Sequence, residues 1–314
     1  MDALDSPLLM DPYAEMFRIY FEQMLKVFPE KILQQNEAAG LSIVYTAMHG
    51  VGYPFVEEAF RVSKLKPIHA VIEQRDADPE FPTVKFPNPE EGKSCLELSM
   101  KLADSIGSNL ILANDPDADR LACAEKNPKT NQWRVFSGNE LGSLLGWWSV
   151  KYYKDKNAGK DLKDCYVLAS TVSSKMLKSM AAIEGFNFEE TLTGFKWMGN
   201  RSVALMERNK DILFAFEEAI GFMFSPAVLD KDGVSASAHL ATMASYLKET
   251  EKMNLAEKLE ELYSTYGYHY SINSYYLCYE PDKIVKIFEK IRNYQEVENA
   301  VSFFFDPEII GFSY

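Results

Sequence analysis

The sequence has 314 residues, of which 47% are hydrophobic and 25% charged, and its formal net charge is -13. This length and composition are typical of a globular protein with at least two packed domains. The acidic balance disfavours nucleic acid and anionic membranes as partners. No apolar run approaches the roughly 18 residues that a transmembrane helix needs, and no signal peptide is expected. Four scattered cysteines predict reduced thiols and a cytoplasmic protein.

Taken in chain order, the first part of the sequence predicts helices that alternate with strands. Apolar residues at helical spacing predict a helix over residues 12–28, and polar residues 34–40 predict a break after it. Four prolines predict a loop over residues 75–92. Between these segments, strands are predicted over residues 41–46 and 68–72, and helices over residues 54–62 and 96–106.

The middle of the sequence predicts a hairpin followed by a capped helix. Residues 121–125 and 133–136 flank a polar turn and predict two antiparallel strands. Ser137 and Glu140 have the spacing of a capping box, which predicts the start of a helix. The lysine-rich residues 154–164 predict a linker.

After the linker the alternation of strands and helices continues, which predicts the α/β class with mixed or parallel sheets. We expect two consecutive mixed-sheet α/β domains, residues 41–158 and 159–270. A helical segment (residues 1–40) precedes them, and the start of a third domain (residues 271–314) follows. The later strands are predicted over residues 166–170, 212–216 and 275–279, and the later helices over residues 173–183, 234–247, 254–266 and 282–294.

An acidic loop, N-D-P-D-A-D-R at residues 114–120, carries carboxylates at Asp115, Asp117 and Asp119. The apolar residues 110–113 before it predict a buried strand, and Pro116 predicts a turn. Three carboxylates at the end of a buried strand repel one another and lose hydration, so a cation is needed to stabilise them. Oxygen ligands alone suit a hard ion such as Mg²⁺, which keeps waters and a substrate phosphate in its shell.

The sequence excludes one alternative for the acidic loop and leaves two open. A calcium-binding EF-hand requires glycine at the sixth position and glutamate at the twelfth, where this sequence has Arg120 and Lys126. A hydrolase with an aspartyl nucleophile and a simple acidic surface turn remain open. The four histidines show no zinc-binding spacing.

A second acidic pair, Glu217 and Glu218, follows the apolar residues 212–216. Adjacent carboxylates after such a strand are costly unless hydroxyls, a metal or basic groups accompany them. Recognition of sugar hydroxyls is one hypothesis, because a carboxylate accepts paired hydrogen bonds. A helix start or a salt bridge is an equal alternative.

Two further stretches carry side chains of possible function. Residues Thr193, Gly194, Phe195 and Lys196 combine a hydroxyl, a flexible turn, an aromatic face and a cation, although aromatic residues beside glycine are commonly core. Lys231 lies between two aspartates and, on its own, is typical of a solvated surface lysine.

In combination these stretches resemble the α-D-phosphohexomutase family. The resemblance rests on N-D-P-D-A-D-R, T-G-F-K-W-M-G-N (193–200), F-E-E-A-I-G (216–221) and D-K-D-G (230–233), in the family's order and spacing. The stretches H-G-V-G and S-G-N-E-L-G-S-L-L-G-W-W are most similar to the phosphoglucomutase type 2 branch, which acts on pentose phosphates. Glucose-1,6-bisphosphate synthase is a similar near relative.

The resemblance implies roles for individual residues. A metal-binding second domain and a sugar-binding third domain would share one cleft. Asp115, Asp117 and Asp119 would hold Mg²⁺, and Arg120 would act as the catalytic residue that neutralises the transferring phosphoryl group. The implied substrate-binding residues are Thr193, Gly194, Phe195, Lys196, Glu217 and Lys231.

The implied function is a Mg²⁺-dependent phosphotransferase that interconverts sugar 1-phosphates with 5- or 6-phosphates, a phosphopentomutase or phosphoglucomutase. Glucose 1,6-bisphosphate would act as phosphoryl primer, and sugar phosphates would be the partners. The family's phosphoserine motif T-A-S-H-N-P and phosphate loop R-x-S-G-T-E-P are not in this sequence. We therefore expect the central piece of a mutase, inactive by itself; a bisphosphate synthase and a non-catalytic Mg²⁺- and sugar-phosphate-binding product are the alternatives.

Overall fold

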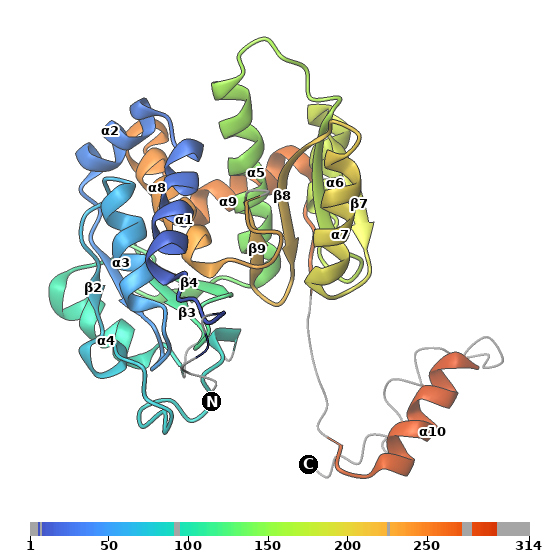
Figure 1. The fold of residues 1–314 in the computed structure, drawn as a ribbon, viewed down its shortest axis with the longest axis horizontal. Helices are drawn as coiled ribbons and strands as arrows, with labels where there is room; N and C mark the ends of the chain where they lie inside the picture. Colours follow the sequence, from blue (N-terminus) through green and yellow to red (C-terminus); the bar gives the residue numbers. More distant parts are fainter. Residues whose placement is uncertain (1–5, 7, 91–94, 225–226, 272–277, 294–314) are drawn as a thin grey trace. The chain divides into compact units, whose positions relative to one another are not determined.

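The computed structural model describes residues 6, 8–90, 95–224, 227–271 and 278–293 (Figure 1). Residues Met1–Tyr270 form one compact unit and residues Ser271–Tyr314 a second. Of the second unit, the structure describes helix α10 (Pro281–Arg292), in which no side chain is buried. Among the described residues, no helix combines the length and the apolar character needed to cross a membrane.

The first sheet of the larger unit has the order β2-β1-β3-β4-β5. Strand β1 is parallel to β2 and β3, whereas β4 is antiparallel to β3 and β5, so the sheet is mixed. Asn114 at the end of β3 pairs with Leu121 at the start of β4, and the acidic loop is the turn between them. The strands are β1 (Ile43–Thr46), β2 (His69–Ala70), β3 (Leu110–Asn114), β4 (Leu121–Lys126) and β5 (Trp133–Val135).

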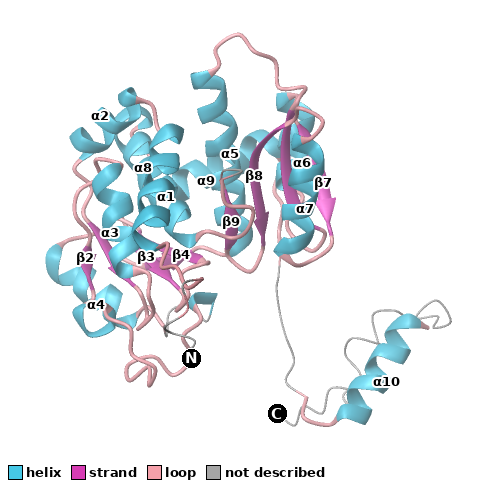
Figure 2. Cartoon of the chain, in the orientation of Figure 1, coloured by secondary structure: helices cyan, strands magenta, loops and turns pink. Residues whose placement is uncertain are grey.

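The second sheet has the order β7-β6-β8-β9 and is also mixed. Strand β6 is parallel to β7 and β8, and β9 is antiparallel to β8. Figure 2 shows the strands of the two sheets as separate groups. The prediction of two mixed-sheet α/β units is confirmed. The strands are β6 (Cys165–Ser170), β7 (Asn187–Thr191), β8 (Asp211–Glu217) and β9 (Gly221–Met223).

Most of the predicted helices are present with small changes at their ends. The capping box at Ser137 and Glu140 forms with both hydrogen bonds, and Gly185 ends α6 in the left-handed conformation. The helices are α1 (Tyr13–Val27), α2 (Glu30–Ala39), α3 (Tyr53–Val62), α4 (Glu97–Ile106), α5 (Gly138–Lys156), α6 (Met176–Glu184), α7 (Phe195–Met206), α8 (Gly233–Tyr246) and α9 (Leu255–Tyr266).

Other predictions were wrong or incomplete. The polar break over residues 34–40 is instead helix α2, which ends at Gly40 in the left-handed conformation. The strand predicted over residues 68–72 is shortened to His69–Ala70 and runs into a 3₁₀ helix, Ile72–Gln74. Strands β7 and β9 and helix α7 had not been predicted as such. The strand predicted over residues 275–279 lies mostly outside the described residues.

Helix α8 connects the two sheets although it follows both in sequence. It packs against strands β3 and β4 of the first sheet, against α2 and α3, and against β9 of the second sheet. Nearly all of its side chains are buried. Helix α5 packs against β8 and α9. The domain boundaries predicted at residues 158 and 270 remain predictions.

Helix α8 also buries a histidine that makes stability depend on pH. His239 is 4% exposed, and its ring stacks on Phe224 with centroids 3.9 Å apart. Burial lowers the pKa of His239 to about 3. The unfolded chain therefore binds this proton at higher pH than the folded chain does, and stability present above a pH of about 6.5 is lost as the pH falls from there toward about 3.

Replacing His239 by phenylalanine is expected to reduce this acid sensitivity. The wild-type chain should lose up to about 1.4 kcal/mol of unfolding free energy per pH unit below about 6.5 from this group. The His239→Phe chain keeps an aromatic ring against Phe224 and lacks the titrating group. Urea unfolding at several pH values measures both slopes, and equal slopes would contradict the assignment.

Candidate active site

The acidic loop is held in shape by Asn114, which is completely buried. The Asn114 side chain accepts a hydrogen bond from the Tyr45 hydroxyl (2.9 Å) and donates one to the Arg120 carbonyl oxygen (2.6 Å). Within the loop, the Ala118 N–H donates to the Asp115 carbonyl oxygen, and Ala118 has a positive φ of 60°. The turn is therefore fixed from both of its ends.

Two glycines allow the loop to pack closely on neighbouring backbone. A Cβ atom on Gly50 would lie 2.3 Å from the Cα and carbonyl oxygen of Pro116. A Cβ atom on Gly233 would lie 2.4 Å from the Arg120 carbonyl oxygen and 2.6 Å from that of Ala118. The Gly233 N–H donates to the Ala118 carbonyl oxygen (3.1 Å), which connects the start of α8 to the loop.

The three aspartates of the loop converge. One carboxylate oxygen from each of Asp115, Asp117 and Asp119 lies within 4.8 Å of the other two. Asp115 is 1% exposed, whereas Asp119 is half-buried and Asp117 is exposed. An all-oxygen cluster with one open side fits a hard divalent cation that keeps waters and a substrate oxygen in its shell.

Arg120 neutralises part of this negative charge. Its backbone N–H and its Nε both donate to the Asp115 carboxylate, at 2.9 and 2.5 Å. Its guanidinium also donates to Asn88 (3.0 Å) and lies 3.8 Å from Glu90. Burial opposes its charge, but Asp115 and the other carboxylates outweigh it and raise the pKa of Arg120. Arg120 therefore stays cationic.

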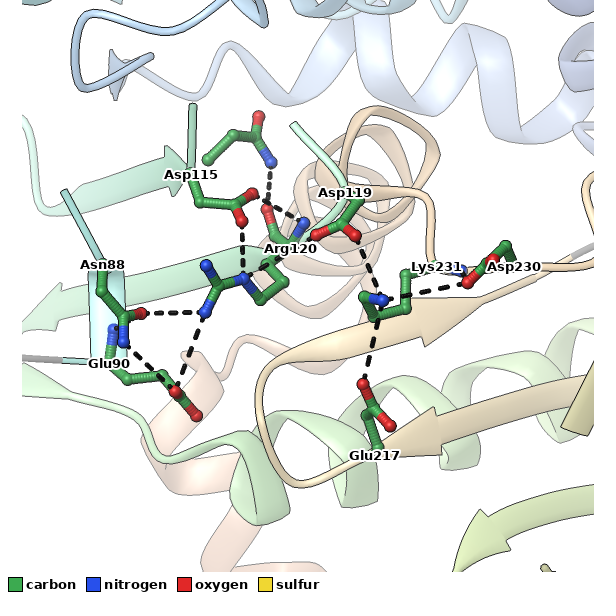
Figure 3. Close-up of polar contacts among 9 residues, drawn as sticks. Asn88, Glu90, Asp115, Asp119, Arg120, Glu217, Asp230 and Lys231 are labelled. Atoms are coloured by element: carbon green, nitrogen blue, oxygen red, sulfur yellow. Dashed lines mark hydrogen bonds and ion pairs between the residues drawn. The ribbon is translucent and has the colours of Figure 1, made fainter. Parts of the chain in front are cut away.

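Lys231 connects the acidic loop to the second sheet (Figure 3). Its Nζ lies 3.1 Å from Asp119, 3.8 Å from Asp230 and 3.9 Å from Glu217, which ends strand β8. Burial works against the charge of Lys231, but the pair with Asp119 outweighs it and the pKa of Lys231 is raised. The two predicted halves of the site, separate in sequence, are thus in contact.

The turn before α7 completes this side of the site. The Gly194 backbone N–H faces Glu217 closely enough to lower the pKa of its carboxyl group, and Lys231 Nζ lies 5.7 Å from the centre of the Phe195 ring. Gly194 has a φ of 107°, a conformation that favours glycine. Burial raises the pKa of Glu217, and Glu218 adds to the rise while Lys231 opposes it.

The remaining predicted residues differ in position. The side chains of Thr193 and Lys196 are exposed, and neither makes a hydrogen bond or ion pair with another described residue. Glu218 points elsewhere: one of its oxygens accepts from the buried hydroxyls of Ser170 (2.9 Å) and Ser173 (3.2 Å). Of the two adjacent glutamates, Glu217 is therefore the one that faces the acidic loop, through Lys231.

Asn88 and Glu90 were missed by the sequence analysis as site residues. They lie in the proline-rich loop predicted over residues 75–92, more than twenty residues before Arg120, which both contact. The available signal was the polar and acidic stretch N-P-E-E inside a loop otherwise fixed by proline. Spacing in sequence did not show that this loop folds back over the arginine.

The geometry weighs against two of the open alternatives for the acidic loop. Asp115 would be the aspartyl nucleophile, but both of its oxygens already accept hydrogen bonds from Arg120 and its side chain is almost inaccessible. A simple surface turn would not place a buried carboxylate beside two others. What the geometry shows is a group of three converging carboxylates flanked by the cationic side chains of Arg120 and Lys231.

Models of known protein families match both sheets of this structure. Residues 18–129 match phosphoglucomutase/phosphomannomutase α/β/α domain II, and residues 138–266 match α/β/α domain III. The chain belongs to the phosphoglucomutase/phosphomannomutase family. The predicted membership of the α-D-phosphohexomutases is confirmed, and in this family's terms the acidic loop lies in domain II and Glu217 and Lys231 lie in domain III.

Curated relatives in this phosphoglucomutase/phosphomannomutase family carry two different names. Human phosphopentomutase is 53% identical over 295 residues, which cover 94% of this chain and 48% of that protein. Human glucose 1,6-bisphosphate synthase is 50% identical over 299 residues, which cover 95% of this chain and 47% of that protein. The chain therefore spans about half the length of the curated relatives that it matches.

A solved structure of the family agrees with the fold. The phosphoprotein pp63/parafusin from Paramecium, a phosphoglucomutase, superposes with a TM-score of 0.61 at 20% sequence identity. The match covers 90% of this chain and 48% of that one. At this identity the likeness supports the arrangement of strands and helices only.

Proposed function

We propose that this chain provides the metal-binding and sugar-binding halves of a Mg²⁺-dependent sugar-phosphate mutase, a phosphopentomutase or phosphoglucomutase. The observation that carries the proposal is the contact between the halves: Lys231 lies between Asp119 of the acidic loop and Glu217 of the second sheet. A sugar phosphate that spans both halves would contact the proposed metal site, the cationic side chains of Arg120 and Lys231, and the carboxylate of Glu217. The name of human phosphopentomutase, one of the curated relatives, supports this activity.

In this proposal the acidic loop performs the electrostatic part of phosphoryl transfer. Asp115, Asp117 and Asp119 would hold Mg²⁺, which would supply charge neutralisation for the phosphoryl oxygens when bound. Arg120 is fixed by its paired contacts with Asp115, so its guanidinium is positioned before substrate arrives. Fixed positive groups of this kind stabilise the charge that develops during transfer without reorganising.

The second half of the site would recognise the sugar and its other phosphate. Glu217 would accept hydrogen bonds from sugar hydroxyls, and its carboxylate lies 3.9 Å from Lys231 Nζ. Phe195 forms an apolar surface beside Lys231. Thr193 and Lys196, exposed at the N-terminus of α7, would be free to contact the distal phosphate together with Lys231.

The proposed reaction needs a phosphoryl donor that these residues do not supply. The family's serine motif T-A-S-H-N-P is not among the 314 residues, and Asp115 is blocked by Arg120. We therefore propose that the transferred group comes from a phosphoserine outside these residues, primed by glucose 1,6-bisphosphate. Sugar phosphates are the proposed partners, and a cytoplasmic location remains the expectation from the sequence.

Glucose-1,6-bisphosphate synthesis is the second candidate function, because the relatives of that name are almost as similar as the phosphopentomutases. Both reactions transfer a phosphoryl group to a sugar phosphate, so the same metal and sugar residues would serve either. Ala219 stands between Glu218 and Ile220 where many phosphoglucomutases have serine. The missing hydroxyl is consistent with an altered sugar preference in both candidates.

Calorimetry with ribose 1-phosphate and with glucose 1-phosphate, each in the presence of Mg²⁺, tests the proposal. We expect binding that Glu217→Gln weakens and that Glu207→Gln, at an exposed glutamate outside the site, leaves unchanged. Absence of binding by both sugar phosphates would refute the sugar-binding role. A mutase assay of the same chain with glucose 1,6-bisphosphate should show no turnover; robust turnover would contradict the external phosphoserine.

A further inference from the structure

Three neighbouring cavities lie along helix α1, from the acidic loop to the start of strand β8. The metal-side cavity, about 500 Å³, is lined by Asp117, Asp119 and Lys231 and by residues of α1. The middle cavity, about 290 Å³, shares Tyr20 and Asp232 with it. A third cavity of about 530 Å³, here called the lysine cavity, shares four residues with the middle one: Gln23, Val27, Phe224 and His239.

The lysine cavity concentrates positive charge in an acidic protein. Its lining includes Lys26 at the end of α1, Lys156 at the end of α5, Lys160 in the following loop and Lys210 before β8, against the single carboxylate of Asp211. The Lys156 Nζ donates to the Lys26 carbonyl oxygen (3.2 Å), so the ends of the two helices meet there. With a net charge of -13 over the whole chain, this local excess is a distinct feature.

Two of these lysines, Lys26 and Lys160, have side chains with neither an ion pair nor a hydrogen bond to a described residue, whereas Lys156 lacks an ion pair but donates to the Lys26 carbonyl oxygen. Lys210 is paired with Asp164 at 2.5 Å, and the Asp211 carboxylate accepts a hydrogen bond from Tyr153. For Lys26 and Lys160, no ion pair forms with any residue that the structure describes. A concave site with unpaired ammonium groups attracts an anionic group.

The middle cavity provides an apolar interior behind these lysines. Apolar side chains line most of it, among them Ile19 and Met24 of α1 and Phe224. One polar atom stands out: Nδ1 of His239 is buried and has no hydrogen-bond partner among the described residues. A buried nitrogen without a partner is unfavourable, and an apolar ligand body in the cavity leaves it unpaired, so the apolar lining and not this nitrogen is the feature that favours a ligand here.

We propose that the lysine cavity and the middle cavity together bind an amphipathic anion, with its acidic head at Lys26 and Lys160 and its apolar body in the middle cavity. Val27, Phe224 and His239 line both spaces, so the two cavities are adjacent, and the proposed ligand would pass between these side chains. A bare inorganic anion would leave the apolar interior unused, and an uncharged hydrocarbon would leave the lysines unused. The ligand class is therefore an alkyl or acyl acid.

This site is separate from the candidate active site. The lysine cavity contains Asp211 and Ile212 at the start of β8, whereas Glu217 ends the same strand in the active site. A seven-residue strand spans roughly 20 Å. The middle cavity lies between the lysine cavity and the metal-side cavity along α1, and it shares Asp232 with the metal-side cavity.

Calorimetric titration of the 314-residue chain with decanoate tests the proposal. We expect one decanoate per chain, bound more weakly at high salt because the lysines are exposed. Decanol, which lacks the charge, and inorganic phosphate, which lacks the apolar body, should each bind at least about tenfold more weakly, since each loses one of the two contributions. Phosphate binding equal to that of decanoate would overturn the amphipathic assignment, as would equal binding of decanol.

Two variants locate the ligand. Lys26→Glu with Lys160→Glu breaks no ion pair of the described chain and should weaken decanoate binding about tenfold or more through charge repulsion. Lys31→Glu with Lys129→Glu has the same net charge at positions outside the cavities and should bind decanoate like the wild type. If both double variants behave alike, the proposed location is wrong.

A third variant tests the apolar half. Val27→Trp places a large side chain in the wall common to both cavities and should abolish decanoate binding while Mg²⁺ binding at the acidic loop is retained. Retained Mg²⁺ binding shows that the variant is folded. Unchanged decanoate binding by a folded Val27→Trp chain would overturn the proposal, and neither outcome depends on the proposed mutase activity.

Discussion

Replacing Asp117 by asparagine is expected to remove Mg²⁺ binding to below the level that calorimetry detects. Asp117 lies within reach of the carboxylates of Asp115 and Asp119, and its side chain has no hydrogen bond or ion pair with the described residues. The substitution therefore removes one negative ligand without breaking a protein contact. Among the three aspartates it isolates metal binding most cleanly, because Asp115 and Asp119 also pair with Arg120 and Lys231.

The stability of the Asp117→Asn chain gives an internal control. Loss of one of three neighbouring negative charges relieves repulsion. The midpoint temperature of thermal unfolding in the absence of metal should therefore be unchanged or slightly higher. Asp161→Asn, in the exposed segment after α5, removes a carboxylate whose partner is the exposed Lys163, and this control should bind Mg²⁺ normally. Wild-type Mg²⁺ affinity in the Asp117→Asn chain would remove the metal assignment of the acidic loop.

Replacing Gly233 by alanine is expected to destabilise the fold and to weaken Mg²⁺ binding together. The new Cβ atom would lie 2.4 Å from the Arg120 carbonyl oxygen and 2.5 Å from Asn114 Nδ2, so either the loop or the start of α8 must move. Overpacking of this kind costs about 1–3 kcal/mol. Urea unfolding measures the loss, and calorimetry measures the change in Mg²⁺ affinity.

A control substitution at a second glycine distinguishes backbone strain from displacement of the acidic loop. Gly185 ends α6 at a φ of 85° with nothing near its missing Cβ, so Gly185→Ala should cost about 1 kcal/mol through backbone strain alone. Mg²⁺ affinity should stay at the wild-type value in that chain. If Gly233→Ala destabilises the protein without affecting Mg²⁺ binding, the acidic loop does not depend on its contact with α8.

The parts of the fold that the sequence predicted best are those with local causes. Strand β3, the hairpin of β4 and β5, and the capping box at Ser137 each depend on residues close together in the chain. Helix α2 was missed because its middle is polar. It exists because Ile32, Leu33, Asn36 and Ala39 form one buried stripe, and because Asn36 donates to Ser63 and Thr242. Those partners are distant in sequence.

The same distinction applies to the site. The aspartates of the acidic loop could be grouped from their spacing, and their carboxylates do converge. Lys231 by itself resembled a surface lysine, and only the resemblance to a family pointed further. Its position between Asp119 and Glu217 depends on how two sheets pack, which no local pattern contains. Asn88 and Glu90 were missed for that reason too.

The placement of helix α8 has a consequence for how the chain is made. The strands of the first sheet are complete once residue Val135 has been synthesised, but the helix that covers β3 and β4 ends only at Tyr246. Until that residue leaves the ribosome, the apolar side chains that α8 will cover stay open to other chains. Folding during synthesis should therefore depend on chaperones through this interval, and nascent chains halted before residue 246 should aggregate.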